Sequence, residues 1–356
     1  MEIRSNVSND WITIRQPDGK VIRHVWQAGQ KDAILFAEAS GRPLLVSGEP
    51  GLGKSQLAFA AAALLDRPLK SFTINSNTEA NDLLYSFDAV RRLAESQVLS
   101  NIYKGGESKR GQLLEEIAIS KFVQPGPLWW AIDGESALKK HPDGKPLYVS
   151  DHSGDWNPQE GIVILIDEID KAEPSLPNGL LEVFGDRKFT PPGSSDPILT
   201  KPDAKAPVVI ITTNEERRLP DPFVRRCLLL KLKMPECLDD QGNVPLLDSE
   251  IATQFLNYFM NLGIAHRNDV SLTEDVMMEV AKMLLEDRQN AMQMGSKPYP
   301  GPAEYLDLLR ALTVFGPKEM ARLADLGETI DPKAVYFDMQ KRLRQFAFQK
   351  VQGDIL

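Results

Sequence analysis

The stretch GEPGLGKS, residues 48–55, has the spacing of a loop that binds phosphate: a glycine, four residues, a second glycine, a lysine and a serine. Glycines let the backbone take dihedral angles that a Cβ atom would resist, so several N–H groups converge on one anion. The apolar run PLLVSG (43–48) precedes the loop, and SQLAFAAAALL (55–65), a good helix former, follows it. This order predicts a strand, a phosphate loop and a helix whose N-terminus faces the anion.

The predicted roles in this loop divide between the phosphates of ATP and a magnesium ion. Lys54 is expected to reach the β- and γ-phosphates, and the hydroxyl of Ser55 is expected to ligate Mg²⁺. The residues expected to bind the nucleotide are Gly48, Glu49, Pro50, Gly51, Leu52, Gly53, Lys54, Ser55 and Gln56.

A second motif, ILIDEID (164–170), is an apolar run that ends in two acids. At the carboxyl edge of a parallel sheet these carboxylates would face the phosphate site. We expect Asp167 to hold the magnesium ion, directly or through water, and Glu168 to polarise the attacking water. Such a run is weak evidence alone, and it gains weight from its position downstream of a phosphate loop.

Two further segments complete the predicted catalytic set. IITTN (210–214) delivers Asn214 to the same sheet edge, where its amide would orient the attacking water beside Glu168. LPDPFVRRCLLLKL (219–232) places two arginines before an apolar run. We expect Arg226, or its neighbour Arg225, to reach the γ-phosphate held by a neighbouring subunit and to stabilise charge in the transition state.

The order of elements predicts an α/β domain followed by a smaller α-helical lid domain. β-branched runs alternate with helical segments in residues 28–234, which favours a parallel sheet flanked by helices. Turn-rich insertions are expected around 100–160 and 186–207, with a helix over 81–96. Residues 1–27 are expected to form a hairpin extension. The helical patterns in 235–356 predict the lid and a C-terminal extension.

Composition narrows the class of protein. The 356 residues carry a net charge of −9, which argues against a protein that coats nucleic acid. Cys227 and Cys237 lack histidines at metal-ligand spacing, so we expect two reduced thiols. The longest apolar runs fall far short of a membrane span, and the polar start MEIRSNVSND lacks a signal-peptide core. We therefore expect a cytoplasmic protein with no membrane span.

Taken in order, the motifs resemble those of the AAA+ ATPases, and their amino-acid sequences are similar to those of the MoxR branch. TTNEERRLPDPFVRRC (212–227) resembles the sensor-and-finger segment of that branch. IDEIDKAEPSLPNGLLEVFGDRKFT (166–190) is similar to its segment after the magnesium-binding strand, and GPLWWA (126–131) fits its layout. The resemblance covers about residues 28–315.

This resemblance implies a hexameric ring with ATP at the subunit interfaces. It also implies remodelling of a protein client, for which the family suggests a von Willebrand A-domain protein, and an insertion at 100–125 that faces the pore. One departure concerns the lid, where the family carries a sensor arginine. The matching stretch, GPAEYLDLLRA (301–311), has Ala303 or Glu304 at that place. Arg310 or Lys297 would have to substitute.

Two other functions stay open from the sequence. One is a nucleic-acid motor, such as a GTP-using McrB-like subunit or a helicase, which would need basic loops. YKGGESKRG (103–111) offers Lys104, Lys109 and Arg110 against Glu107, a weak patch. The other is a slow nucleotide-gated switch, favoured by the missing lid arginine. Trp129 and Trp130, which could suggest base stacking, are expected to pack in the core.

Overall fold

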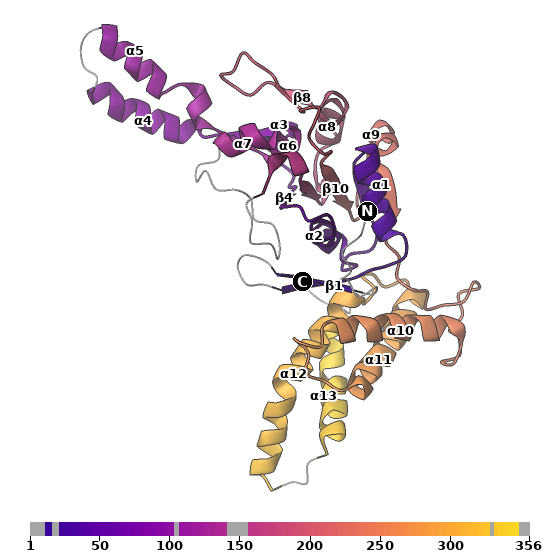
Figure 1. Ribbon diagram of the computed structural model, residues 1–356. Coiled ribbons are helices and arrows are strands. Elements are labelled where there is room, and N and C mark those ends of the chain that lie inside the picture. Colours follow the sequence, from indigo (N-terminus) through magenta and orange to yellow (C-terminus); the bar gives the residue numbers. More distant parts are fainter. Residues whose placement is uncertain (1–10, 16–20, 103–106, 141–155, 328–330, 349–356) are drawn as a thin grey trace.

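The computed structural model describes residues 11–15, 21–102, 107–140, 156–327 and 331–348. The chain forms an α/β core and a separate helical lid, joined by residues 232–249, with the lid below the core in Figure 1. None of the helices in these ranges combines the length and the apolar character needed to cross a lipid bilayer.

The centre of the core is a five-stranded parallel sheet. Its strands, in spatial order, are β11 (Leu228–Lys231), β3 (Leu44–Ser47), β10 (Val208–Thr213), β7 (Val163–Asp167) and β4 (Leu69–Thr73). Register pairs Thr213 with Ser47 and Thr73 with Asp167, so these strand ends lie along one edge. The predicted parallel sheet is confirmed, and its carboxyl edge collects the ends of the motifs.

Side chains of the strands alternate between two apolar layers, one on each face of the sheet. Val163 and Leu165 pack with Leu57 of the helix after the phosphate loop. Ile164 and Ile166 pack on the opposite face with Trp129. Because both faces are covered, the strands read as continuous apolar runs rather than alternating ones.

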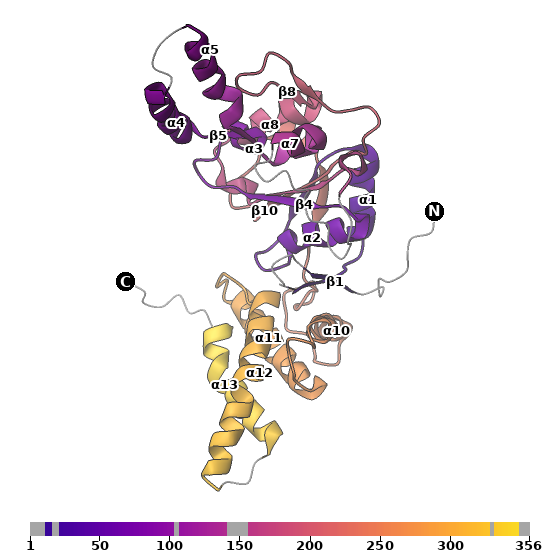
Figure 2. The ribbon, with the colours of Figure 1, turned by 60° about the vertical axis from the view of Figure 1, so that its left-hand side comes forward.

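Helices supply these two layers (Figure 2). On one face lie α1 (Gln30–Ser40) and α2 (Lys54–Leu65). On the other lie α3 (Ala80–Leu84), α6 (Pro127–Ile132), α7 (Gly134–Lys140), α8 (Ser175–Asp186) and α9 (Asp221–Arg226). Trp129 and Trp130 of α6 are 2% and 1% exposed, which confirms their predicted place in the core.

The region around residue 100 differs from the expected loops. The helix predicted over 81–96 is not continuous: its two ends are helical, but β5 (Tyr85–Phe87) interrupts it by pairing with β6 (Val123–Pro125). Beyond β5, α4 (Ala89–Ile102) and α5 (Glu107–Glu116) form a helical arm that extends away from the sheet (Figure 1). The short helix η1 (Ile119–Phe122) leads back to β6.

The other expected irregular stretches also contain short elements. Residues 186–207 contain the two-residue strands β8 (Lys188–Phe189) and β9 (Ile198–Leu199), which pair antiparallel. The short helices η2 (Pro158–Glu160) and η3 (Ile169–Lys171) flank β7. Residues 141–155 of the expected turn-rich insertion lie outside the described residues.

A small antiparallel pair precedes the core. β1 (Trp11–Arg15) pairs with β2 (Val21–Val25), and the predicted turn PDG lies outside the described residues. Ile14 and Ile22 pack against Ala60 of α2. Val25 contacts the apolar cluster of the lid, so this hairpin touches both parts of the molecule.

The described part of the lid contains the helices α10 (Glu250–Ala265), α11 (Glu274–Gln293), α12 (Pro302–Asp325) and α13 (Pro332–Ala347). Phe255, Phe259 and Tyr305 lie at the centre of its own apolar cluster. Cys237 is buried at the edge of that cluster and Cys227 is buried in the core, and both thiols are free. The predicted helical lid after the sheet is therefore present.

Candidate functional site

The phosphate loop connects β3 to α2, as its flanking sequence predicts. Gly48 has a φ of 147°, and a Cβ atom there would lie 2.6 Å from the carbonyl oxygen of Leu232. Gly53 has a φ of 79° and caps α2. Both positions therefore need glycine. The free N–H groups of the first turn of α2, which begins at Lys54, give the loop a positive end for an anion.

Lys54 is held inside the loop it belongs to. Its Nζ atom donates hydrogen bonds to the carbonyl oxygens of Gly48 at 2.7 Å and Glu49 at 2.9 Å. Burial lowers the pKa of Lys54, and the nearby carboxylates, Asp170 and Asp167 foremost, act in the opposite direction. The ammonium group therefore lies among acceptors that a phosphate oxygen could replace.

Ser55 and Asp167 meet at the edge of the sheet. The Ser55 hydroxyl donates to Asp167 Oδ1 at 2.8 Å and lies 3.0 Å from Oδ2. Thr212 of the neighbouring strand also donates to Oδ1, at 2.6 Å, and was not foreseen from the sequence. A hydroxyl and a carboxylate are hard oxygen donors that suit Mg²⁺, which takes its other ligands from phosphates and water. The residues present thus fit this ion.

Glu168 follows Asp167 in the chain, but its carboxylate points toward the ammonium group of Lys171. Its backbone is left-handed, with a φ of 62°, and its N–H donates to Thr212 Oγ1 at 2.9 Å. Its Oε2 atom accepts from Lys171 at 2.6 Å. This hydrogen bond raises the pKa of Lys171. Glu168 is partly exposed and lines the same pocket as the phosphate loop.

Asn214 follows β10 at the same edge and also lines the pocket. Its backbone N–H donates to Asp170 Oδ2 at 3.0 Å, and the N–H of Glu216 donates to the same atom at 3.0 Å. Asp170 is 2% exposed, and its Oδ1 atom has no hydrogen-bond partner among the residues that the structure describes. Asp170 therefore fixes the loop that carries Asn214. The only sequence signal for it was an acid three residues after Asp167.

The two candidate finger arginines stand apart from this pocket. Arg225 and Arg226 are exposed at the end of α9, and neither lines the pocket that contains the phosphate loop. Arg42 holds this end of the helix by donating to the carbonyl of Arg225 at 2.8 Å and of Arg226 at 3.2 Å. Within one chain, these arginines therefore lie outside the pocket that is expected to hold the phosphates.

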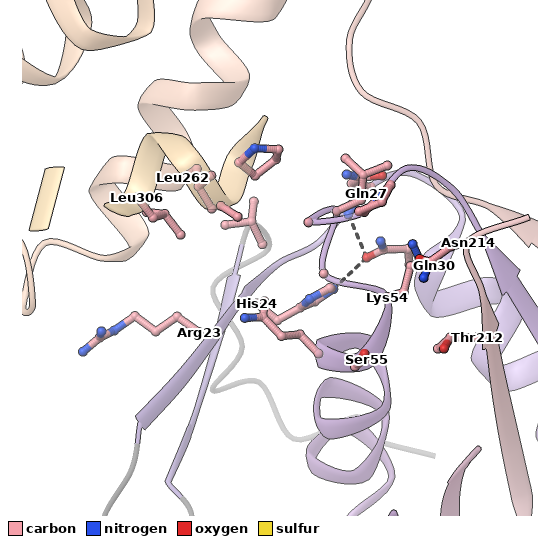
Figure 3. A pocket seen from close by; sticks show the side chains of 18 of the residues that line it. Arg23, His24, Gln27, Gln30, Lys54, Ser55, Thr212, Asn214, Leu262 and Leu306 are labelled. Atoms are coloured by element: carbon pink, nitrogen blue, oxygen red, sulfur yellow. Dashed lines mark hydrogen bonds between the residues drawn. The ribbon is translucent and has the colours of Figure 1, made fainter. Parts of the chain in front are cut away.

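The pocket is a cavity of about 410 Å³ between the phosphate loop, the N-terminal hairpin and the lid (Figure 3). The lid contributes Tyr258 and Leu262 from α10 and Leu306 from α12. Of the two candidate substitutes for a lid sensor, Arg310 lines the pocket and pairs with Asp307 at 3.2 Å. Lys297 does not line it, and its amine lies 6.0 Å from the ring centre of Tyr299.

The hairpin side of the pocket was missed by sequence reasoning. His24 Nε2 lies 2.8 Å from Gln30 Oε1, which also accepts from the N–H of Gln27 at 3.0 Å (Figure 3). Burial lowers the pKa of His24 to about 4, so the imidazole is neutral near pH 7. Nothing in the pattern of residues 11–25 marks a wall of a nucleotide pocket, because its position depends on packing against α2.

Comparisons with known proteins address the family directly. The model of the AAA domain, dynein-related subfamily, matches residues 43–227, and no curated protein matches the chain. A proposed ATPase of Cytophaga hutchinsonii is 14% identical over 88% of this chain and 87% of its own, with a TM-score of 0.33. The Thermotoga maritima RuvB Holliday junction branch migration motor is 13% identical over 88% of this chain and 67% of its own, with a TM-score of 0.41.

The family match covers more than half of the 356 residues. It includes the phosphate loop, the strand end at Asp167, the loop of Asn214 and the pair of arginines that precedes Cys227. The chain therefore belongs to the AAA domain family, in its dynein-related subfamily, and is an ATPase.

Proposed function

We propose that this ATPase is a MoxR-like remodeller that works in the cytoplasm as a ring, hexameric in the family it resembles, on a protein client. The observation that carries the ring is the separation of Arg225 and Arg226 from the pocket of their own chain. The described pocket is rich in acids at its sheet edge, where a transferred phosphoryl group needs added positive charge. An exposed arginine at the end of α9 can supply it to a neighbour.

Each residue of the sheet edge has a proposed role in hydrolysis. Lys54 leaves its carbonyl partners for the β- and γ-phosphates, and the backbone of residues 48–56 surrounds them. Ser55 and Asp167 would hold Mg²⁺, which would supply positive charge to offset the charge of the phosphates. Glu168 turns from Lys171 to polarise the attacking water. Asn214 orients that water from the adjacent strand end.

The lid and the partner subunit complete the proposed reaction. Arg310, which lines the pocket from α12, takes the part of the missing lid sensor. Arg226 of a neighbouring subunit, with Arg225 beside it, acts as the finger that stabilises charge on the γ-phosphate.

A protein client is favoured over nucleic acid by charge and by the helical arm α4–α5. The net charge is −9, and the arm exposes apolar side chains: Val90 at 81%, Leu93 at 61%, Val98 at 60% and Leu114 at 60%. Exposed apolar residues gathered on a projecting element suit contact with protein. A von Willebrand A-domain protein is the client class that the MoxR resemblance implies. Lys104, part of the basic patch weighed for a motor, lies outside the described residues.

ATP turnover per subunit, measured across a range of protein concentrations, tests this proposal. If the finger comes from a neighbour, turnover per subunit rises with concentration, in step with ring assembly followed by light scattering. Glu168→Gln is the inactive control. Constant turnover per subunit in a monomeric protein would contradict the ring, and stimulation by double-stranded DNA would indicate a nucleic-acid motor instead.

A further inference from the structure

An arginine of the lid makes an ion pair with the phosphate loop. Arg288 lies on α11, and its side chain is only 5% exposed. Its Nη2 atom donates to Glu49 Oε2 at 2.7 Å, and its Nη1 atom donates to the carbonyl of Pro300 at 2.9 Å. A buried guanidinium needs such partners, because an unpaired charge in the interior is costly.

The two sides of this pair belong to different parts of the molecule. Pro300 and the ring of Tyr299, whose centre lies 5.6 Å from the Arg288 guanidinium carbon, hold the arginine within the lid. Glu49 belongs to the loop between β3 and α2, and its side chain is 47% exposed. The guanidinium is therefore fixed on the lid side, and the carboxylate follows the phosphate loop.

Glu49 is also the residue whose carbonyl oxygen accepts a hydrogen bond from Lys54. Its side chain contacts the lid while its backbone contacts the lysine expected to bind the phosphates. The lid also approaches the loop at a second place, where a Cβ atom on Gly51 would be 3.3 Å from the Cβ atom of Ala303, at the start of α12. Gly51 and Ala303 line the pocket, and Glu49 directly precedes Pro50, which also lines it.

We infer that Arg288 is a positioning residue, which pairs with Glu49 to hold the lid against the phosphate loop and so sets the affinity for nucleotide. The inference rests on the proposed function only in taking this pocket as the nucleotide site. The lid residues Tyr258 and Leu306 line the same pocket, so releasing the lid removes part of its wall. Loss of either partner weakens binding through one shared contact, and the two losses are not additive.

A double-mutant cycle on binding of fluorescently labelled ADP tests the pair. Arg288→Met and Glu49→Gln are each expected to weaken binding about tenfold, within the usual range of coupling between sites. The double variant is expected to bind no more weakly than the weaker single variant. Lys282→Met is the matched control on α11: Lys282 pairs with Glu279 at 2.8 Å, away from the pocket, and its loss is expected to leave affinity unchanged.

The inference would be overturned if the two effects multiplied in the double variant. It would also be overturned if the single variants bound ADP as tightly as the natural sequence or more tightly, or if Lys282→Met lost as much affinity as they do. All titrations are made where circular dichroism shows a folded protein. If Arg288→Met does not fold, Arg288→Lys replaces it, because an amine keeps the charge but cannot reach both Glu49 and Pro300. ADP binding requires neither client nor hydrolysis, so failure here is distinguishable from failure of the proposed remodelling role.

Discussion

Among the acids at the sheet edge, Asp170 is the most deeply buried. Its carboxylate is 2% exposed and receives the N–H groups of Asn214 and Glu216 on a single oxygen. These bonds join the turn after β7 to the loop after β10. The position of the Asn214 side chain therefore depends on a residue that touches no phosphate.

Asp170→Ala tests this dependence. A methyl group accepts neither N–H, so the loop of Asn214 loses both hydrogen bonds and shifts. We expect kcat for ATP to fall about 10- to 100-fold with a small change in KM, since misplacement by about an ångström has such effects. Steady-state kinetics checks this, with the exposed Asp196→Ala as control. An unchanged kcat would show that the loop keeps its position without Asp170.

Two buried histidines give the protein a specific dependence of stability on pH. Burial lowers the pKa of His24 and of His266 from 6.5 to about 4 in each case. The unfolded chain therefore binds more protons between these values. The stability that the neutral histidines contribute is present above pH 6.5, and we expect it to be lost as pH falls from 6.5 toward 4, by a few kcal/mol per histidine.

Denaturant unfolding across this pH window measures the loss. The double variant His24→Gln/His266→Gln lacks both titrations, so its free energy of unfolding is expected to change less between pH 6.5 and 4. Identical slopes for the variant and the natural sequence would mean that other groups cause the acid dependence.

Local spacing predicted the loop between a strand and a helix and placed Asp167 at a strand end, and the structure has both there. The roles of these residues stay predictions. It was silent on Thr212 and His24, which reach the site only through strand pairing and packing against α2. Asp170 stood inside a recognised motif, but its function as a support depends on where the next strand ends.

At the scale of elements, α6 shows how closely a helix start can approach its neighbours. A Cβ atom on Gly126 would lie 2.6 Å from the carbonyl oxygen of Leu83 and 2.8 Å from the carbonyl carbon of Leu84. At Gly111 of α5, no described residue lies within 4 Å of such an atom. The same substitution at these two positions should therefore have opposite effects on stability.

Gly126→Ala is expected to lower the free energy of unfolding by about 1–3 kcal/mol, because backbone atoms must move apart. Gly111→Ala is expected to raise it by about 0.5–1 kcal/mol, because alanine is the better helix former. Urea denaturation of the two variants measures both. A Gly126→Ala protein as stable as the original would contradict the close approach at α6.

Elements with continuous apolar runs were predictable and those set by distant partners were not. The strands β3, β7 and β10 follow from their apolar runs, since both faces of the sheet are covered there. The break of the expected helix at β5 depends on pairing with β6, about forty residues away, which local propensity cannot reveal. Pro317 lies inside α12, which continues to Asp325 although proline there removes one helical N–H donor.

At the scale of the whole molecule, the pocket lies where three parts of the chain meet. The hairpin packs on α2 through Ile14 and Ile22, and Arg23 forms an ion pair with Asp269 of the lid. The loop residue Glu49 pairs with Arg288 of the lid. No single segment defines this enclosure, which is why the motifs revealed the phosphate end of the pocket and not its other walls.

A single copy of the chain does not place Arg225 or Arg226 in its own pocket. Arg225 and Arg226 are exposed outside the pocket, although the proposed chemistry needs a cation at the γ-phosphate. We therefore propose that the working site is shared between two copies of the chain, one giving the pocket and the other an arginine.

Mixing two inactive variants tests this claim most directly. Arg226→Ala keeps its own Glu168, Glu168→Gln keeps its arginine, and each alone is expected to hydrolyse ATP at least about 100-fold more slowly than the natural sequence. In an equal mixture about a quarter of the interfaces in a ring join an intact Glu168 to an intact Arg226, so ATPase activity should return to about that fraction. Activity in the mixture no higher than the mean of the separate variants, with mixed rings present, would contradict a shared site.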